Sequence, residues 1–448
     1  MNDRPPPSER DRRRPKPWAS ITRLDVHYQD DGPSIRVGGL AADRRGRVYF
    51  QYDAAWLTRG VELSPYQLPL ALGSAVTAAP DPKRLHGLHG LFADAMPDDW
   101  GTRVLDGALR RAGIVPDQAG PLDRLAWLGD RAMGALTYRP AHAWPGDAER
   151  AVSLDVLAAQ AQRVVDGAVE PTGAAGEPSA LDLLQRAAGT AGGAQPKVLV
   201  ALSPDGRTLV AGADPPPGST PYLVKFTPPR DGLGLRTDSG PLEEAYARMA
   251  RAAGIDVPPS RLLATTDGRQ HFAVERFDRT RVGGRRHVHT LGGLLGREAG
   301  DEGDYDDLLR WARQLTGDAR VIEAGIRRLW FNLTALNDDD HLKNVAFLLD
   351  PDDGWALAPA YDLTYTPSRA GERGMSVAGH AARIRWATVV ALAERHGIRP
   401  ARTSEIRAEV DAAVAAWLHH AGEAQVPPAS AAEVGGALAQ RRTVLDAG

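Results

Sequence analysis

A polar segment enclosed by two strongly apolar ones constrains the fold of this chain more than any other feature. Before it, apolar side chains recur at the alternating four- and three-residue spacings of one helix face, at Ile322, Ile326, Leu329, Leu333 and Leu336. This helix is predicted to end near Asn337. After the polar segment, residues 345–349 and 355–357 predict the two strands of a hairpin. Residues 337–344 are therefore expected to be fixed in place, whereas most acidic runs are solvated loops.

The spacing of the acids in this segment is typical of phosphoryl transfer. Asp339 precedes Asn344 by five residues, and Asp362 follows the predicted hairpin. Protein kinases place a base aspartate five residues before a metal-binding asparagine, and a second metal-binding aspartate follows. A carboxylate can orient the attacking hydroxyl, and oxygen ligands can hold Mg²⁺ against the phosphates. Lys343 would stabilise charge on the transferred group. A calcium loop is disfavoured, because its central glycine and terminal glutamate are missing.

A glycine-rich segment at 189–197 is a candidate phosphate loop. Its adjacent glycines, Gly192 and Gly193, allow backbone N–H groups to approach an anion. The spacing fits neither a Walker A motif nor the glycine-rich loop of protein kinases. By itself, the segment is equally compatible with a flexible turn.

Two predicted strands would complete a nucleotide site. Lys225 lies inside the apolar strand 222–226, where its head either reaches water or contacts ATP phosphates. Its expected partner is Glu243 or Glu244 of the next predicted helix. Backbone groups of 274–277 would hydrogen-bond adenine, although a lone apolar strand is also compatible with core packing.

Taken together and in this order, these motifs resemble the HipA family of serine/threonine kinases, the toxins of bacterial toxin–antitoxin pairs. The resemblance spans about residues 24–417. The matching segments are 96–101 and 129–134 near the N-terminus, and 193–197, 224–226, 274–279, 339–344 and 360–362 beyond it. The resemblance implies an α+β, two-lobed protein-kinase-like fold with an extra N-terminal α/β subdomain and a helical C-terminal lobe.

The same resemblance suggests a division of the chain into domains. They are a disordered Arg/Pro-rich tail at 1–20, a HipA-like N-terminal subdomain at 21–145, the ATP-binding part of the small lobe at 180–285 and a helical catalytic lobe at 286–448. Local patterns agree, since 34–37 and 47–50 predict strands, 91–111 predicts a helix interrupted at 96–101, and 384–445 is mostly helical.

The resemblance also implies roles for individual residues, with ATP and Mg²⁺ as cofactors. Asp339 and Lys343 would be catalytic, and Asn344 and Asp362 would bind the metal. The residues expected to bind ATP are Gly192, Gly193, Ala194, Gln195, Pro196, Lys197, Lys225, Glu275, Arg276, Phe277, His341, Leu342, Asn344 and Tyr361. In such kinases a serine of the phosphate loop autophosphorylates, which inactivates the enzyme by loop ejection. Thr190 occupies the matching position here.

The implied partners are a small helix-turn-helix antitoxin resembling HipB, operator DNA reached through that antitoxin, and a protein substrate such as an aminoacyl-tRNA synthetase. The kinase would inhibit growth, and the antitoxin would neutralise it. The alternatives are a small-molecule kinase and a catalytically silent regulator that acts through a DNA-binding partner. The intact Lys225, Asp339, Asn344 and Asp362 argue against the silent regulator.

Two departures from the family pattern accompany the resemblance. Asp340 stands where many relatives have a small residue, and it is expected to add charge at the metal site. Residues 287–290 replace a more acidic motif; they are expected to lie outside the catalytic cluster, where they would touch substrate.

Composition excludes several classes of site. The 448 residues contain no cysteine, which excludes disulfides and thiolate sites and suits a cytoplasmic location. The sequence has no run of about 18 apolar residues, so no membrane span is expected. The Arg/Pro-rich segment 1–16 lacks the apolar core of a secretory signal. A net charge of −3 disfavours general binding to polyanions.

Overall fold

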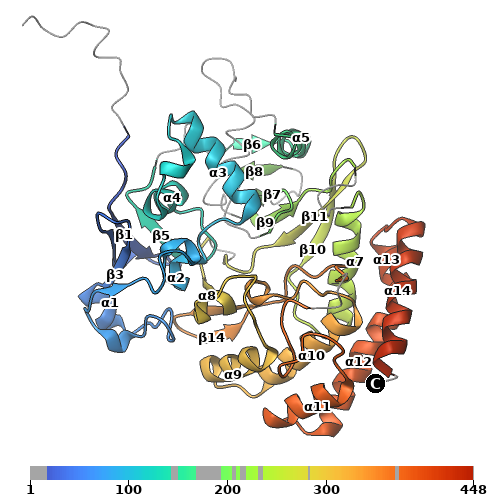
Figure 1. Ribbon diagram of the computed structural model, residues 1–448. Helices are drawn as coiled ribbons and strands as arrows, with labels where there is room; N and C mark the ends of the chain where they lie inside the picture. The colour runs from blue at the N-terminus through green and yellow to red at the C-terminus, as the bar shows by residue number, and fades with distance from the viewer. Residues whose placement is uncertain are drawn as a thin grey trace, which may run out of the picture.

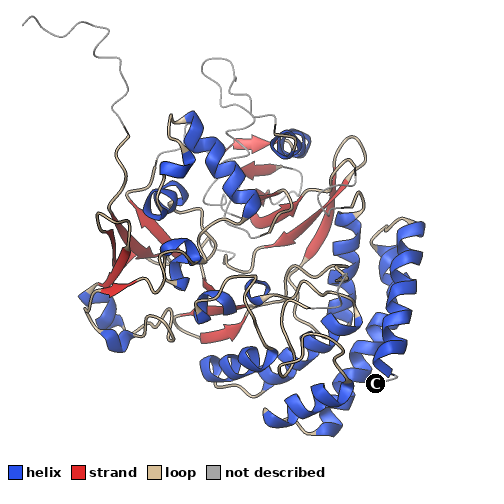
Figure 2. Ribbon diagram, in the orientation of Figure 1, coloured by secondary structure: helices blue, strands red, loops and turns tan. Residues whose placement is uncertain are grey.

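The computed structural model describes residues 18–142, 150–167, 193–203, 208–211, 218–230, 236–280, 283–368 and 373–446. These residues form three β-sheets, and helices dominate the C-terminal third (Figures 1 and 2). The predicted α+β architecture with a helical C-terminal lobe is confirmed. None of the helices formed by these residues has the length and apolar character needed to cross a bilayer.

The first sheet is antiparallel and has the strand order β4-β3-β2-β1-β5. Its strands are β1 (Arg23–Tyr28), β2 (Ile35–Ala42), β3 (Val48–Tyr52), β4 (Thr77–Ala78) and β5 (Leu136–Arg139). Alternation along β1 turns Leu24, Val26 and Tyr28 into the core. The same part of the chain contains α1 (Ala54–Arg59), α2 (Gly90–Ala93), α3 (Asp99–Arg111) and α4 (Pro121–Leu128), with 3₁₀ turns at Leu70–Leu72, Leu85–Gly87 and Pro116–Gln118. The break between α2 and α3 spans residues 94–98, so it overlaps the predicted interruption at 96–101, whose last three residues are helical.

The second sheet is also antiparallel and has the order β10-β11-β9-β7-β8-β6. Its strands are β6 (Arg150–Val152), β7 (Lys197–Leu202), β8 (Leu209–Ala211), β9 (Thr220–Lys225), β10 (Ser260–Ala264) and β11 (Gln270–Glu275). Helices α5 (Leu154–Val165) and α7 (Ser239–Ala252) pack on it. β6 and α5 lie in the interval that the predicted domain division leaves unassigned. Lys197 is opposite Lys225 in the pairing of β7 with β9, so the register brings two lysines together.

The third sheet is small and belongs to the helical part of the chain. It consists of β12 (His287–Thr290), β13 (Ala346–Asp350) and β14 (Gly354–Leu357), which confirms the predicted hairpin. The helices are α8 (Leu291–Leu295), α9 (Tyr305–Thr316), α10 (Arg320–Thr334), α11 (Trp386–Arg395), α12 (Pro400–Ala415), α13 (Trp417–Glu423) and α14 (Pro428–Asp446), with a 3₁₀ turn at Leu342–Asn344. α10 ends close to the predicted position, and Leu336 beyond it takes a left-handed backbone conformation with φ 53°.

Helices α2 and α8 join the N-terminal part of the chain to the helical part (Figure 1). A Cβ atom at Gly90 would lie 1.8 Å from the carbonyl oxygen of Gly293, so only glycine allows this approach. Beside this contact, Asp94 accepts hydrogen bonds from the Thr290 backbone N–H at 2.8 Å and from its hydroxyl at 2.7 Å. Backbone contact and a buried carboxylate thus fix the first sheet against the region that contains segment 337–344.

Candidate active site

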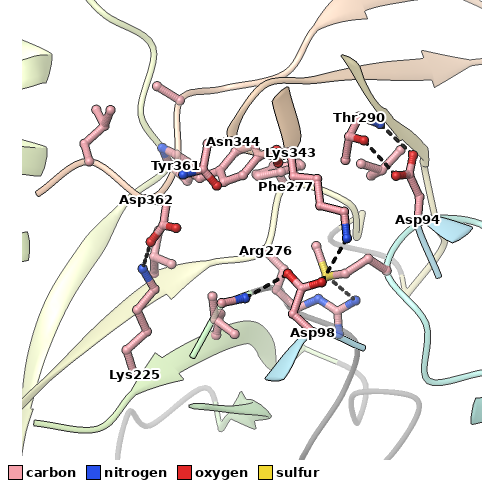
Figure 3. A pocket seen from close by; sticks show the side chains of 18 of the residues that line it. Asp94, Asp98, Lys225, Arg276, Phe277, Thr290, Lys343, Asn344, Tyr361 and Asp362 are labelled. Carbon is pink, nitrogen blue, oxygen red and sulfur yellow. Dashed lines mark hydrogen bonds and ion pairs between the residues drawn. The ribbon is translucent and has the colours of Figure 1, made fainter. Parts of the chain in front are cut away.

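A pocket lies where the first sheet, the second sheet and the helical part of the chain meet (Figure 3). The space between its walls amounts to about 1530 Å³ when the open solvent at its mouth is included. Asp98 and Met133 line it from the N-terminal part, Lys225 lines it from β9, and Asp339 and Asp362 line it from the helical part. The pocket thus collects polar side chains from three regions far apart in the sequence.

Lys225 is the central cation of one wall. Its side chain is buried, and its ammonium group forms ion pairs with Glu243 of α7 and, at 2.5 Å, with Asp362. Of the two predicted partners, Glu243 makes the contact, while Glu244 pairs with Arg248 at 2.7 Å. Burial alone would raise the pKa of Asp362, but the neighbouring lysines outweigh it and lower that pKa to about 2. Asp362 is therefore anionic at neutral pH.

The backbone of Asp362 is held in the left-handed region, with φ 57°. Non-glycine residues seldom adopt this conformation, although aspartate tolerates it better than most. Such a conformation costs about 1–3 kcal/mol and persists only where the surroundings impose it. The neighbouring structure therefore sets the direction of this carboxylate.

The predicted phosphate loop is described only in part. Gly192 and Thr190 lie outside the described residues, and Gly193 lines the pocket. Beyond it, Ala194 is exposed, the Gln195 amide donates to the Phe226 carbonyl at 3.2 Å, and the Pro196 carbonyl accepts from the Phe226 N–H at 2.8 Å. These two bonds tie the segment to the end of β9.

Lys197 follows this segment and is buried behind Gly193. A Cβ atom on Gly193 would lie 2.8 Å from the Lys197 ammonium nitrogen. Burial and the neighbouring Lys225 lower the pKa of Lys197 to about 8. Its ammonium group is therefore mostly charged at neutral pH but loses its proton at a pH only slightly higher.

The predicted adenine strand lines the pocket through Glu275, Arg276 and Phe277. The rings of Phe277 and Tyr361 have centroids 5.7 Å apart and form an apolar surface. Glu275 accepts from a tyrosine hydroxyl at 3.2 Å. The Arg276 guanidinium donates to Asp278 at 2.7 and 2.9 Å. This part of the pocket therefore offers flat apolar contact, whereas the backbone N–H groups of Glu275 and Arg276 already donate to carbonyls within the protein, each at 2.9 Å.

The three consecutive aspartates of segment 337–344 point to different places. The Asp339 side chain is 62% exposed and lines the pocket. Asp338 and Asp340 are buried, and Arg373 donates to them at 2.7 and 2.5 Å. The Tyr305 hydroxyl also donates to Asp340, at 2.6 Å. Asp340 is therefore not a further pocket ligand, because it is held in the interior by Arg373, but its charge still acts on Asp339.

The residues after Asp339 are arranged by bonds within the segment. The Asn344 side-chain amide donates to the Asp339 carbonyl at 2.8 Å, and the His341 ring lies 3.9 Å from the Asp339 carboxylate. Tyr361 donates its hydroxyl to the Lys343 carbonyl at 2.6 Å. Partial loss of solvent within the pocket raises the pKa of Asp339 above its ordinary value, and Asp362 and Asp340 add to this while His341 opposes it. A carboxylate with a raised pKa in a cleft is a candidate for proton transfer.

Five of the described residues expected to bind ATP do not line the pocket: Ala194, Gln195, Pro196, Lys197 and Leu342. Leu342 is fully buried in the core of the helical part. It follows His341 directly, so segment 337–344 alternates between core and pocket. The matching motif in the sequence could not separate the two environments.

Residues 287–290 combine two buried histidines with contact to the pocket, which His287, Val288 and Thr290 line. His287 and His289 are each 1% exposed. The His287 ring contacts the Leu63 carbonyl at 3.0 Å, and the His289 ring contacts Asp94 at 2.7 Å and Ser64 at 3.0 Å. Burial lowers the pKa of His287 to about 3, with a smaller contribution from His289. This strand therefore holds the N-terminal part of the chain and also borders the pocket, so its contact with substrate stays a prediction.

Sequence reasoning assigned no role to the pocket residues of the N-terminal part. Asp98 pairs with Lys343 at 2.9 Å, Met133 contacts the Arg276 guanidinium at 3.7 Å, and Asp94 binds Thr290 (Figure 3). The available signal was the match of segments 96–101 and 129–134 to the family. These segments include Asp98 and Met133 but not Asp94, and the match did not indicate what the residues contact.

Known proteins match this chain over most of its length. The profile of the HipA N-terminal domain matches residues 24–139, and that of the HipA-like C-terminal domain matches residues 189–417. The putative kinase Y4mE of Sinorhizobium fredii is 31% identical over 353 residues, which cover 74% of this chain and 75% of that protein. The putative kinase Y4dM of the same species is 35% identical over 144 residues, 29% of this chain and 35% of that protein. A solved complex of HipA, HipB and operator DNA from Shewanella oneidensis contains a chain of the same fold, with a TM-score of 0.65, 19% identity and coverage of 94% and 95%.

Proposed function

Because this chain belongs to the HipA family, we propose that it is an ATP- and Mg²⁺-dependent kinase that phosphorylates serine or threonine hydroxyls of proteins. One observation carries the proposal: a single pocket gathers Asp339, Asn344, Asp362 and the Lys225–Glu243 pair. A lysine held by a helical glutamate, two oxygen ligands and a free carboxylate are the parts that phosphoryl transfer needs.

The nucleotide would lie between the second sheet and the catalytic segment. Phe277 and Tyr361 would pack on adenine, whose edge would meet backbone groups of the Glu275–Phe277 stretch. Lys225 and Lys343 would contact the phosphates. Both lysines are already held in place by carboxylates, which reduces the entropy lost when a phosphate binds.

The residues proposed to bind metal fit a hard cation. The Asn344 amide nitrogen is engaged with the Asp339 carbonyl, which leaves its side-chain oxygen as a ligand. Asp362 is anionic and 31% exposed, so a carboxylate oxygen is accessible from the pocket. Among the described residues, no group of three or more histidines and carboxylates forms a metal cluster. This fits Mg²⁺, which takes one or two protein ligands and fills its shell with water and phosphates. When bound, Mg²⁺ would neutralise charge on the phosphates.

Asp339 would orient the substrate hydroxyl and accept its proton. Its side chain is the exposed member of the three aspartates, and its raised pKa suits a proton acceptor. The same position follows from the five-residue spacing to Asn344. Structure and sequence pattern thus support the same base independently.

We further propose that the kinase belongs to a toxin–antitoxin pair. The fold match from Shewanella oneidensis was solved with HipB and operator DNA. A HipB-like helix-turn-helix antitoxin would bind this chain, link it to operator DNA and neutralise its inhibition of growth. An aminoacyl-tRNA synthetase is the candidate substrate, and Thr190 is the candidate autophosphorylation site. These proposals rest on the family relationship.

Phosphoproteomics of cells that express the wild type or Asp339→Asn tests the function. The wild type should phosphorylate serine or threonine in a small set of proteins, and a chelator should abolish transfer in vitro. Asp339→Asn should bind ATP and melt like the wild type, yet transfer phosphate about 10²–10³-fold more slowly. Near-normal transfer by Asp339→Asn would reject this base. Transfer to small molecules alone would indicate a small-molecule kinase, and no binding of ATP would indicate a silent regulator.

A further inference from the structure

The N-terminal part of the chain places a carboxylate in the pocket that none of the roles above uses. Asp98 accepts a hydrogen bond from the Lys343 ammonium group at 2.9 Å through one oxygen, and from the Gly193 backbone N–H at 3.0 Å through the other (Figure 3). Asp98 and Lys343 are 245 residues apart in the sequence. One side chain therefore joins the start of α3, the phosphate loop and the catalytic segment.

The helix that follows does not use this carboxylate. Asp98 occupies the N-cap position of α3, where an aspartate ordinarily accepts from the free N–H groups of the first turn. Its side chain makes no such capping bond. Both oxygens instead point to the pocket, so helix stability does not explain the residue.

Asp98 is charged in this arrangement. Burial alone would raise its pKa, but Lys343 and the Gly193 N–H outweigh burial and hold the pKa below its ordinary value. Hydrogen bonds between ionised groups are about twice as strong as neutral ones. The contact with Lys343 is therefore strong enough to fix the lysine side chain.

We propose that Asp98 is a positioning residue for phosphoryl transfer, which holds the Lys343 ammonium group and the Gly193 amide where they contact the nucleotide phosphates. The inference rests on the proposed kinase function. Asp98 does for Lys343 what Glu243 does for Lys225. An ammonium group has three donors, so Lys343 can bind Asp98 and a phosphate oxygen together. Transfer then depends on the docked N-terminal part, because α3 belongs to it.

The first test compares Asp98→Asn with Asp99→Asn in the full-length chain. Asp99 is the next residue, is exposed and belongs to the first turn of the same helix, so it is a matched control. The readouts are the melting temperature and the rate of transfer from γ-labelled ATP with Mg²⁺ to lysate proteins. Asp98→Asn should reduce the rate about tenfold to hundredfold, because small misplacements of catalytic groups cost up to about 10². Asp99→Asn should match the wild type, and both variants should melt normally.

The second test asks whether Asp98 acts through Lys343. If it does, Asp98→Asn should slow Lys343→Gln no further, whereas independent effects would multiply. ATP affinity, measured by calorimetry in the Asp339→Asn background, should fall severalfold in Asp98→Asn. Multiplying effects, an unchanged rate in Asp98→Asn, or tighter ATP binding would each overturn the proposal; the last would mean that the carboxylate competes with phosphate.

The same measurements separate this inference from the kinase function. If the wild type transfers no phosphate, the proposed function fails, but the ATP titrations still test Asp98. In that case Asp98→Asn should weaken binding in the wild-type background and have no further effect in Lys343→Gln. ATP affinity unaffected by Asp98→Asn would then overturn the positioning role as well.

Discussion

Two buried cations in this molecule each bind two carboxylates, and only one of the two clusters is closed. In the closed cluster, Arg373 contacts Asp338 and Asp340, and the three side chains are 1%, 5% and 2% exposed. The Tyr305 hydroxyl and the Ser368 backbone N–H supply further hydrogen bonds to these carboxylates, at 2.6 and 3.0 Å. Every carboxylate of this cluster has partners inside the protein, so the cluster serves the fold.

The open cluster also combines one central cation with two carboxylates, but one of these carboxylates is exposed to the pocket. Lys225 and Glu243 are 5% and 4% exposed, whereas Asp362 is 31% exposed towards the pocket. Asp362 therefore carries its negative charge where a ligand can reach it. The two clusters therefore differ in the exposure of one carboxylate. The closed cluster stabilises the fold, whereas the exposed Asp362 suits the open cluster to bind a cation.

The largest expected effect is loss of stability when the closed cluster is broken. Arg373→Ala leaves Asp340 buried without a cation and leaves Asp338 only the more distant Arg441, at 3.7 Å, so it should reduce the free energy of unfolding by about 3–5 kcal/mol. Chemical unfolding followed by fluorescence measures it. Arg320→Ala is the control, because Arg320 pairs with Asp318 but is 89% exposed, and its melting temperature should match the wild type. Equal stability of the two variants would show that the closed cluster does not support the fold.

Local patterns in the sequence were enough to find the catalytic segment. Asp339 and Asn344 lie in one eight-residue stretch, and Asp362 follows one hairpin later, so spacing alone indicated them. The partner of Lys225 was narrowed to two adjacent glutamates. Neighbouring helix positions point about 100° apart, and only the packing of α7 on its sheet selects Glu243.

Contacts between distant segments could not be predicted from the sequence. Arg373, which pairs with Asp340, lies 33 residues further along the chain in a stretch without a recognisable motif. The Asp98–Lys343 pair depends on how the first sheet docks, and that docking depends on glycine contacts and buried imidazoles. Nothing in the local pattern around either residue specifies a partner so far away.

The next effect concerns the open cluster and separates stability from binding. Lys225→Met should cost roughly 1–3 kcal/mol of unfolding free energy, the cost of a buried polar group left unsatisfied. This is less than for Arg373, because Asp362 reaches the pocket and burial already raises the pKa of Glu243, so that Glu243 can protonate. Because the Lys225–Glu243 pair is buried, a measurable loss of unfolding free energy is expected.

A double variant sharpens this prediction. Lys225→Met with Glu243→Leu removes both partners of the buried pair and should recover much of the lost stability. ATP affinity should remain at least about tenfold weaker than in the wild type, because the charge-assisted contact to phosphate is gone. Recovery of ATP affinity together with stability would mean that Lys225 contributes to the fold alone.

The smallest expected effect is a pH dependence from Lys197, the lysine opposite Lys225. Its pKa in the free protein is lowered to about 8 by burial and by Lys225. A bound phosphate stabilises the protonated form, so binding takes up a proton above pH 8 and ATP affinity should fall as the pH rises through 8. Fold stability should change in the opposite direction. The folded pKa lies below the ordinary value of 10.5, so the unfolded chain binds more protons and stability should rise between pH 8 and 10.5.

Calorimetric titration with ATP and Mg²⁺ from pH 7.5 to 9 measures the fall in ATP affinity, in a range above the phosphate pKa of about 6. Lys197→Arg, which stays charged throughout, should bind with a flat profile. A flat profile in the wild type would show that the charge of Lys197 does not affect nucleotide binding at the open cluster. Lys225 would then be the effective cation beside Asp362.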